Sequence, residues 1–383
     1  MKSDQIRKVE CEQCCVLLNF SMTDYASQGK TQPYNPVDLK VTNKHRTVQH
    51  KIAKVITGGL SRTVEDILDA HAYILPINLL FNKLLFHSAL RLCLLSKSHP
   101  LQPLLRKVAR HKVKRHLSPI HNLIQFARIN PREVEVIDPV RRSPSYVLTF
   151  NLIILPSKDA ALTFANLTNA SVPVRIYSNG SGFEGGIGAS ALLYINNKLA
   201  RSLRCYLGTP TKHTIYEAKG VGLLMGLHLL NSLSCQLTFP TILGSNSQVA
   251  IRALGNQRAH SGQYLLNAIY LAAECLHSKQ DGLINRIERQ HLNNAGESWV
   301  GKQRNSEFAG PLVPGHKDFA PNEQADEEAK LAAQGHSSIA KFLPPLLQKC
   351  LPLSVSALQQ SHSDRLKSRW RCRWKNFKRE NWL

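Results

Sequence analysis

The change in apolar spacing at Val174 constrains the fold more than any other feature of this sequence. Apolar residues from Val48 to Arg128 recur with the spacing of helices, whereas after Val174 the period shifts toward two, as in half-buried strands. The elements predicted there are three strands, the second and third joined by a tight Asn-Asn turn, then a buried helix, a short strand and a helix: Val174–Ser178, Ala189–Ile195, Leu199–Leu207, Thr214–Leu233, Pro240–Leu243 and Gly262–His277. This order predicts an α/β domain whose sheet contains one antiparallel hairpin.

Composition and turn-forming residues divide the chain into five predicted segments. Residues 1–46 have no sustained period and are expected to be irregular or disordered, whereas residues 47–130 form a basic helical region. Several prolines make residues 131–172 the expected linker, which precedes the α/β domain at residues 173–336. Residues 337–383 form a basic tail.

The charge of the chain limits the class of partner. The sequence has 49 lysine and arginine residues against 26 acidic residues, and its formal charge is +23. Such an excess favours a polyanion through counterion release, so nucleic acid is the first expectation and an anionic membrane surface the second. Polar residues interrupt the leucine-rich run Ile77–Leu95, which indicates a core helix and argues against a membrane span. Nine scattered cysteines and no leading apolar stretch predict an intracellular protein, nuclear or cytoplasmic and not secreted.

Four separated polar residues fall where regular elements would position them rigidly. Asn179 and Asn246 end predicted strands, and strand ends are where open sheets bind ligands. Glu217 lies in the first turn of the buried helix, and Asp326 lies in a later helix. Phosphodiester hydrolysis with two divalent ions needs several oxygen ligands, mostly carboxylates, projecting from such elements. The four residues meet the geometric half of that requirement.

Four motifs surround these residues: Tyr177-Ser178-Asn179-Gly180-Ser181, Tyr216-Glu217-Ala218, Gly244-Ser245-Asn246-Ser247, and Pro314-Gly315-His316 followed by Asn322-Glu323-Gln324-Ala325-Asp326. Together they resemble type 1 ribonuclease H, specifically the domain at the C-terminus of fungal non-LTR retrotransposon reverse transcriptase polyproteins. The resemblance implies an α/β fold with a mixed five-stranded sheet and flanking helices, preceded by a small helical region. It also implies Mg2+ as the cofactor and the RNA strand of an RNA–DNA hybrid as the substrate.

The same resemblance assigns roles to individual residues. The catalytic set is Asn179, Glu217, Asn246, Asp326 and His316; the first four occupy metal-ligand positions, and His316 matches a mobile-loop histidine that assists product release. Asn replaces an acid at two of the four ligand positions, which halves the formal negative charge of the quartet. We therefore expect reduced Mg2+ affinity and impaired hydrolysis. The alternative is a nuclease-dead retrotransposon remnant that binds hybrid or single strands.

Some of these residues also fit purely structural roles. Glu217 follows Thr214 with the spacing of a capping box, and Asp326 lies in an acidic stretch typical of a solvated helix face. The segment Lys302–Pro311 is polar, whereas the resembling family usually has an alternating apolar strand leading into His316. We therefore expect that strand to be lost.

Two basic stretches outside the α/β domain are candidates for nucleic-acid contact. Arg106–His116 contains no acid, which fits either a phosphate contact or a solvated helix face. Arg365–Arg379 interleaves basic residues with Trp370, Trp374 and Phe377. That pattern fits stacking on unpaired bases, nuclear targeting, or a solubilising tail.

Overall fold

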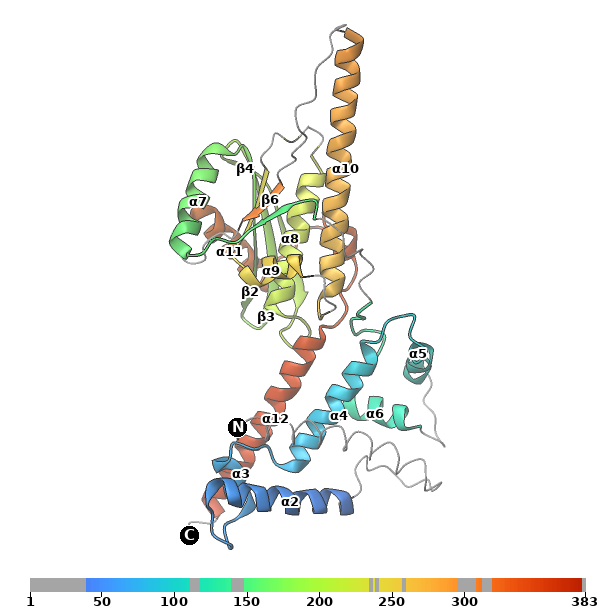
Figure 1. Cartoon of the computed structure of the whole chain (residues 1–383), viewed down its shortest axis with the longest axis vertical. Coiled ribbons are helices and arrows are strands. Elements are labelled where there is room, and N and C mark those ends of the chain that lie inside the picture. Colours follow the sequence, from blue (N-terminus) through green and yellow to red (C-terminus); the bar gives the residue numbers. More distant parts are fainter. Residues whose placement is uncertain are drawn as a thin grey trace, which may run out of the picture. The chain divides into compact units, whose positions relative to one another are not determined.

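The computed structural model describes residues 39–110, 118–138, 148–233, 237, 241–256, 260–294, 308–311 and 319–380 (Figure 1). The chain divides into two compact units, a helical unit formed by Met1–Val134 with Gln359–Leu383, and a sheet unit formed by Glu135–Leu358. None of the helices in the described ranges combines the length and the apolar character needed to cross a membrane.

The helical unit is arranged around one central helix. Its helices are α2 (Leu39–Thr57), α3 (Glu65–His71), α4 (Ile77–Cys93), α5 (Gln102–Arg110), α6 (Pro119–Ala127) and most of α12 (Val355–Glu380). α4 packs against α2, α5 and α6, and it begins directly after Pro76. Phe86, Leu90 and Cys93 of α4 are fully or nearly fully buried, so the leucine-rich run forms a core helix as predicted.

The sheet unit is built on one mixed sheet. Its strands are β1 (Asn151–Ile153), β2 (Val174–Phe183), β3 (Gly186–Ile195), β4 (Lys198–Gly208), β5 (Thr241–Ser245) and β6 (Phe308–Pro311), in the spatial order β1-β6-β5-β2-β3-β4. β2, β3 and β4 are antiparallel, whereas β5 runs parallel to β2, β6 to β5, and β1 to β6. Asn196 and Asn197 both have positive φ (49° and 65°), which is the conformation of a tight type I′ turn and confirms the predicted hairpin.

This sheet confirms the predicted α/β class and corrects two details. β2 to β6 correspond to the five strands that the resemblance implied, and β1 is an additional edge strand that forms in the segment expected to be a linker. The expectation that the strand within Lys302–Pro311 is lost is wrong, because β6 forms there. β6 lies between β5 and β1 and is paired on both sides. Strand formation depends strongly on such neighbours, which compensate here for a weak apolar pattern.

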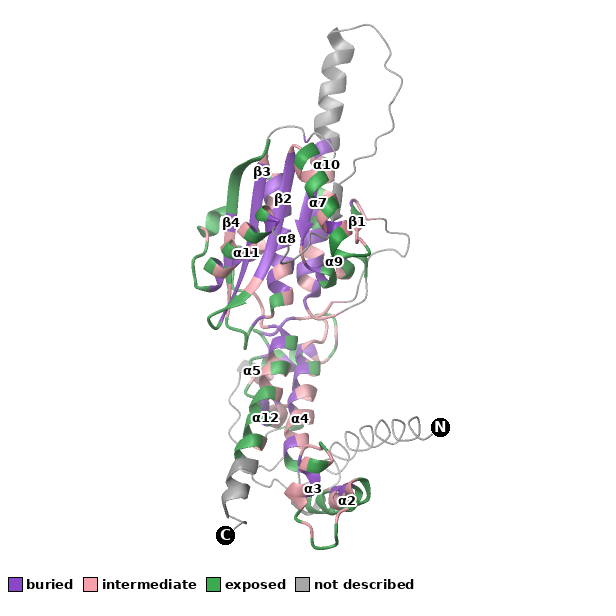
Figure 2. Ribbon diagram, turned by 90° about the vertical axis from the view of Figure 1, so that its left-hand side faces the viewer, coloured by how far each residue is buried: buried purple, intermediate pink, exposed green. Residues whose placement is uncertain are grey.

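Alternate residues of the sheet face two different cores. Ile176 and Leu193 belong to a large core covered by α8 (Ile215–Asn231) and α10 (Gln263–Asn294). Tyr177 and Leu192 belong to a smaller core on the opposite face, covered by α7 (Lys158–Ser171) and α11 (Ala320–Ala333). Figure 1 shows these helix pairs on opposite sides of the sheet, and Figure 2 shows that β2 and β3 are buried between them.

The expected linker at residues 131–172 contains the helix α7. Ser157 caps this helix, since its hydroxyl accepts the backbone N–H of Ala160 (3.1 Å). Ala165 of α7 is buried in the same core as Tyr177. The prolines that suggested a linker lie outside the helix, so they bound it and do not break it.

The expected tail at residues 337–383 is also partly folded into the sheet unit. Two short 3-10 helices, η1 (Ala340–Phe342) and η2 (Pro345–Gln348), lie at its start. Leu343 and Leu347 belong to the large core, and α12 begins at Val355. These turns are too short for a periodic signal, so their order comes from burial of leucine against the rest of the unit. At the other end of the chain, α2 begins at Leu39, before the predicted boundary.

Candidate functional site at the ends of β2 and β5

The parallel pairing of β2 with β5 ends where two candidate residues begin. The last pair joins Ser178 with Ser245, so Asn179 and Asn246 are the first residues beyond the paired segment on each strand. The carboxyl ends of neighbouring parallel strands meet at one edge of a sheet, where α/β sheets bind ligands. Strand register therefore places both predicted residues at the same edge.

Helix α11 brings Asp326 to this edge. The helix approaches β3 so closely that a Cβ added to Gly188 would lie 2.2 Å from the backbone nitrogen of Ala333. The hydroxyl of Ser190 donates to the carbonyl oxygen of Ala325 (2.5 Å), the residue before Asp326. A glycine and a buried hydroxyl on β3 thus fix the position of α11 along the strand.

The side chains of Asn179 and Asp326 are in direct contact. Nδ2 of Asn179 donates to Oδ1 of Asp326 (2.9 Å), and Oδ1 of Asn179 accepts the backbone N–H of Gly180 (2.8 Å). Asn179 is only 1% exposed, so solvent hardly competes for these bonds. Two carboxylates at this separation would repel each other, whereas an amide beside a carboxylate forms a hydrogen bond. Residues that are far apart in the sequence are joined here.

Two lysines lie around Asp326. Nζ of Lys330, one helical turn later, is 2.7 Å from Oδ2 of Asp326, and this hydrogen-bonded ion pair raises the pKa of Lys330. Lys219 of α8 is half-buried; burial lowers the pKa of Lys219, and the charge of Asp326 opposes that shift. A Cβ on Gly180 would lie 2.4 Å from the backbone nitrogen of Lys219, so α8 approaches β2 closely at this point. We call Asn179, Lys219, Asp326 and Lys330 the strand-edge cluster.

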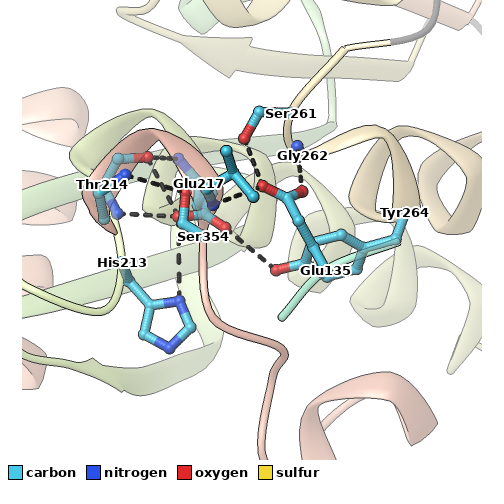
Figure 3. A network of polar contacts seen from close by, with 10 residues as sticks. Glu135, His213, Thr214, Glu217, Ser261, Gly262, Tyr264 and Ser354 are labelled. Atoms are coloured by element: carbon cyan, nitrogen blue, oxygen red, sulfur yellow. Dashed lines mark hydrogen bonds and ion pairs between the residues drawn. The ribbon is translucent and has the colours of Figure 1, made fainter. Parts of the chain in front are cut away.

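Glu217 lies in a different cluster (Figure 3). Its Oε2 accepts the backbone N–H of Thr214 (2.8 Å), and Thr214 in turn accepts the N–H of Glu217, which completes the capping box of α8. Its Oε1 accepts the hydroxyl of Tyr264 in α10 (3.2 Å), and Nδ1 of His213 lies 3.9 Å from Oε2. The structural role suggested by the Thr214 spacing is confirmed. The contacts of this carboxylate are with helix starts, and the structure does not bring it into contact with Asn179.

Helix geometry puts Lys219 and Glu217 on different sides of α8. Successive helical residues are rotated by about 100°, so residues two apart project from nearly opposite sides. Gly222 marks the side of α8 that faces the sheet, because a Cβ there would lie 3.0 Å from the carbonyl oxygen of Asn179. Lys219 lies three residues before Gly222 and therefore on the same side. Gly222, a small residue where the helix meets the sheet, is the sequence signal that could have identified Lys219.

Glu135 is the second buried carboxylate in Figure 3, and it serves two helix starts. Its Oε2 accepts the N–H of Gly262 at the start of α10 (2.7 Å), and its Oε1 accepts the N–H of Val355 at the start of α12 (2.8 Å). The hydroxyl of Ser261 also donates to Oε1. Burial raises the pKa of Glu135, and these three hydrogen bonds oppose the shift. We regard this carboxylate as structural, since it satisfies donors that no helix can satisfy by itself.

The remaining predicted residues are less well connected. Oδ1 of Asn246 is buried and has no hydrogen-bond partner within the part of the chain that the structure describes. The neighbouring Ser247 caps α9 (Gln248–Gly255) by accepting the N–H of Ala250 (3.2 Å). His316 lies outside the described residues. The structure thus joins Asn179 with Asp326, puts Asn246 at the same edge, and gives Glu217 other hydrogen-bond partners, Thr214 and Tyr264.

The strand-edge cluster does not provide the oxygen ligands that two divalent cations need. Its one carboxylate, Asp326, already accepts from Asn179 and Lys330, and the amide oxygen of Asn179 is turned to a backbone N–H. Two ammonium groups would repel a divalent ion placed among them. Across the described ranges, no group of three or more His, Cys, Asp or Glu side chains could hold a metal ion. The residues present therefore do not fit a pair of Mg2+ ions.

Comparison with known proteins adds similar solved structures. No protein-family model and no curated protein matched the chain. The N-terminal RNase H domain of Rv2228c from Mycobacterium tuberculosis, solved as a fusion with maltose-binding protein, is 18% identical over 43% of this chain and 99% of its own, with a TM-score of 0.28. RNase H1 from Halobacterium salinarum is 15% identical over 43% and 98%, with a TM-score of 0.27. LC11-RNase H1 in complex with an RNA/DNA hybrid is 14% identical over 42% and 97%, with a TM-score of 0.26.

The topology of the sheet unit decides the fold. Three antiparallel strands in hairpin succession are extended by the parallel strands β5 and β6, and helices cover both faces. The fold is ribonuclease H-like. The ribonuclease H-like domain differs from the expected arrangement by the extra edge strand β1 and by the ion pair that Lys330 forms with Asp326 at the strand edge.

Proposed function

We propose that the chain binds nucleic acid, with an RNA–DNA hybrid as the first candidate, and that metal-dependent hydrolysis is impaired. The observation that carries this proposal is the hydrogen bond from Nδ2 of Asn179 to Oδ1 of Asp326. It stands where metal-dependent hydrolysis would need two ionised carboxylates facing a cation. With an amide donor in that place, the site holds its geometry through a hydrogen bond and has little affinity for Mg2+.

Charge supports the binding half of the proposal. The formal charge of +23 favours association with a polyanion through counterion release. In the helical unit, one segment of α12 presents exposed basic side chains, namely Arg365, Lys367, Arg369 and Arg371. Such side chains suit phosphate contacts, which position a protein on nucleic acid without reading its sequence. We therefore expect affinity that depends weakly on sequence and steeply on salt.

A cleavage assay tests the catalytic half. The full chain is incubated with a labelled RNA–DNA hybrid and either Mg2+ or Mn2+, and products are separated on a gel. We expect no cleavage above that of an Asp326→Asn control, because the remaining acid cannot organise two cations. Metal-dependent cutting by the wild type that the Asp326→Asn change abolishes would contradict the proposal.

A binding assay tests the other half. Fluorescence anisotropy with labelled hybrid, double-stranded DNA and single-stranded RNA compares the three ligands at several salt concentrations. We expect the hybrid to bind, with an affinity that falls steeply as salt rises. Binding of single strands with hybrid excluded would favour the alternative of a single-strand module, and no binding to any of the three would refute the function.

We also propose that the chain derives from the C-terminal part of a fungal non-LTR retrotransposon polyprotein and acts in the nucleus or cytoplasm. The motifs around Asn179, Asn246 and Asp326, and the helical unit formed by the preceding sequence, support this origin. Genomic sequence upstream of the coding region tests it: a polymerase domain in the same reading frame is expected. Imaging of a fluorescent fusion tests the compartment.

A further inference from the structure

The strand-edge cluster carries an excess of positive charge. Lys330 pairs with the carboxylate of Asp326, the backbone of Lys219 packs against Gly180 next to Asn179, and Asn179 itself is neutral. One ammonium is enough to balance the carboxylate. The second leaves the cluster able to attract an anion at an edge where sheets of this kind bind ligands.

Lys219 is held in place by the packing of α8. A Cβ on Gly180 would meet the backbone of α8 at Lys219 (2.4 Å to the nitrogen) and at Ala218 (2.5 Å to the carbonyl carbon). Because these are backbone atoms, α8 cannot slide or rotate at this point without moving β2. The lysine stem therefore leaves a fixed position and is half-buried, so little rotamer freedom remains to be lost when the ammonium meets a ligand.

The two lysines are unequal in their bond to Asp326. Nζ of Lys330 forms the close ion pair at 2.7 Å, whereas Lys219 interacts with the carboxylate through space, without a hydrogen bond among the described contacts. Lys219 therefore retains the capacity to donate to a ligand. An anion can approach Lys219 without breaking the pair that Lys330 makes.

We propose that the ammonium of Lys219 binds a backbone phosphate of the nucleic acid at the strand edge, in the place where a divalent cation would otherwise stand. This inference rests on the proposed function and specifies the contact through which the ribonuclease H-like domain engages its ligand. Binding at this site is then independent of divalent metal. Lys330 keeps Asp326 neutralised, so the acid does not repel the phosphate.

The first experiment measures binding of a labelled RNA–DNA hybrid by the full chain in Mg2+ and in EDTA. We compare the wild type with Lys219→Met, which keeps the stem and removes the charge, and with Lys198→Met, a control at an exposed lysine of the same unit. We expect EDTA not to weaken wild-type binding, because no divalent ion takes part in the contact and Mg2+ only competes for the phosphates. Lys219→Met should weaken binding roughly five-fold and lower the slope of log affinity against log salt by about one, as the loss of one phosphate contact does. Thermal unfolding of all three proteins checks that they remain folded.

Two results of that experiment overturn the inference and leave the proposed function intact. One is hybrid binding by the wild type that EDTA weakens. The other is a Lys219→Met protein that binds as tightly, and with the same salt slope, as Lys198→Met. Absence of hybrid binding by the wild type would refute the proposed function together with this contact.

The second experiment needs no nucleic acid. Calorimetric titration with Mn2+ is made on the wild type and on Lys219→Glu, which replaces the ammonium beside Asp326 with a carboxylate. We expect no heat of binding for the wild type and measurable binding for Lys219→Glu. Mn2+ binding by the wild type that Asp326→Asn removes would show that the position accepts a metal as it stands, and would overturn the inference.

Discussion

Replacing Glu135 with alanine removes an acceptor that three donors share. The N–H of Gly262 and the N–H of Val355 lie 2.7 and 2.8 Å from its two oxygens, and the hydroxyl of Ser261 donates to the same oxygen as Val355. Glu135 is 1% exposed, so water cannot easily replace the carboxylate. A buried donor left without a partner costs about 1–3 kcal/mol. The hydroxyl of Ser261 can rotate to another acceptor, whereas the two backbone donors cannot.

The expected loss follows from those two backbone donors. Glu135→Ala should lower the free energy of unfolding by about 3 kcal/mol, which is two donors at the middle of that range, less the cost of burying the wild-type charge. Glu135→Gln keeps Oε1, which serves Ser261 and Val355, and loses only the acceptor of Gly262. The free energy of unfolding lost by Glu135→Gln should therefore be about half of that lost by Glu135→Ala.

The pH dependence of stability in the wild type and in Glu135→Gln gives a second measurement. Burial raises the folded-state pKa of Glu135, so the folded chain binds more protons than the unfolded chain between the ordinary glutamate pKa of about 4.3 and the raised value. The contribution of Glu135 to the stability of the wild type should therefore be greatest below that pH window and should fall as the pH rises through it. Glu135→Gln does not titrate, so its stability relative to the wild type should improve across the same window.

Urea unfolding followed by far-UV circular dichroism measures these differences. The matched control is Glu133→Ala, an exposed glutamate bonded to Asn130, which should change stability by no more than about 0.5 kcal/mol. If Glu135→Ala cost no more than this control, the reasoning that one carboxylate satisfies two helix starts would be refuted.

Three further predictions follow from packing, capping and titration. Gly180→Ala should destabilise the chain by about 1–3 kcal/mol in urea unfolding, because the new Cβ would lie 2.4 Å from the backbone of α8; Gly220→Ala, whose Cβ would be 3.6 Å from the nearest atom, should be neutral or stabilising. Ser157→Ala should cost about 1 kcal/mol by removing the cap of α7, and an unchanged melting temperature would contradict this. His362 stacks on Phe86, and burial lowers the pKa of His362 from 6.5 to about 4. The contribution of His362 to stability is therefore present above pH 6.5 and is lost as the pH falls toward 4. His362→Phe should flatten that pH dependence in an acid titration followed by circular dichroism.

The elements with the clearest periodicity were recovered from the sequence. The expected strands at Val174–Ser178, Ala189–Ile195 and Leu199–Leu207 correspond to β2, β3 and β4, and the apolar helix corresponds to α8 with Thr214 as its cap. Each has many residues in one repeating environment, so the pattern reports the structure. β6 and η2 are short, and both are stabilised by neighbours that are distant in the sequence. Their residues alone contain too little repetition to predict them.

The residues of the candidate site also divide into those that the sequence placed correctly and those that it did not. Asn179 and Asn246 were placed correctly relative to strand ends, because a strand end is a local feature. Glu217 was grouped with them because it lies early in the right helix, yet its side chain serves the capping box and Tyr264. Lys219 was overlooked since a lysine does not resemble a metal ligand. The choice between positions two residues apart depends on the rotation of α8 about its axis.

The sequence by itself determined the α/β class, the order of the main strands, the basic charge and the amide residues Asn179 and Asn246 at the strand ends. These follow from residue types and from periods of two or 3.6 residues, which act over a few neighbours. Only the tertiary structure decided which side of α8 faces the sheet, which lysines lie around Asp326, and that β6 forms. Those outcomes depend on contacts such as the close approach of Gly180 to the α8 backbone, where atoms far apart in the sequence exclude one another and leave one arrangement.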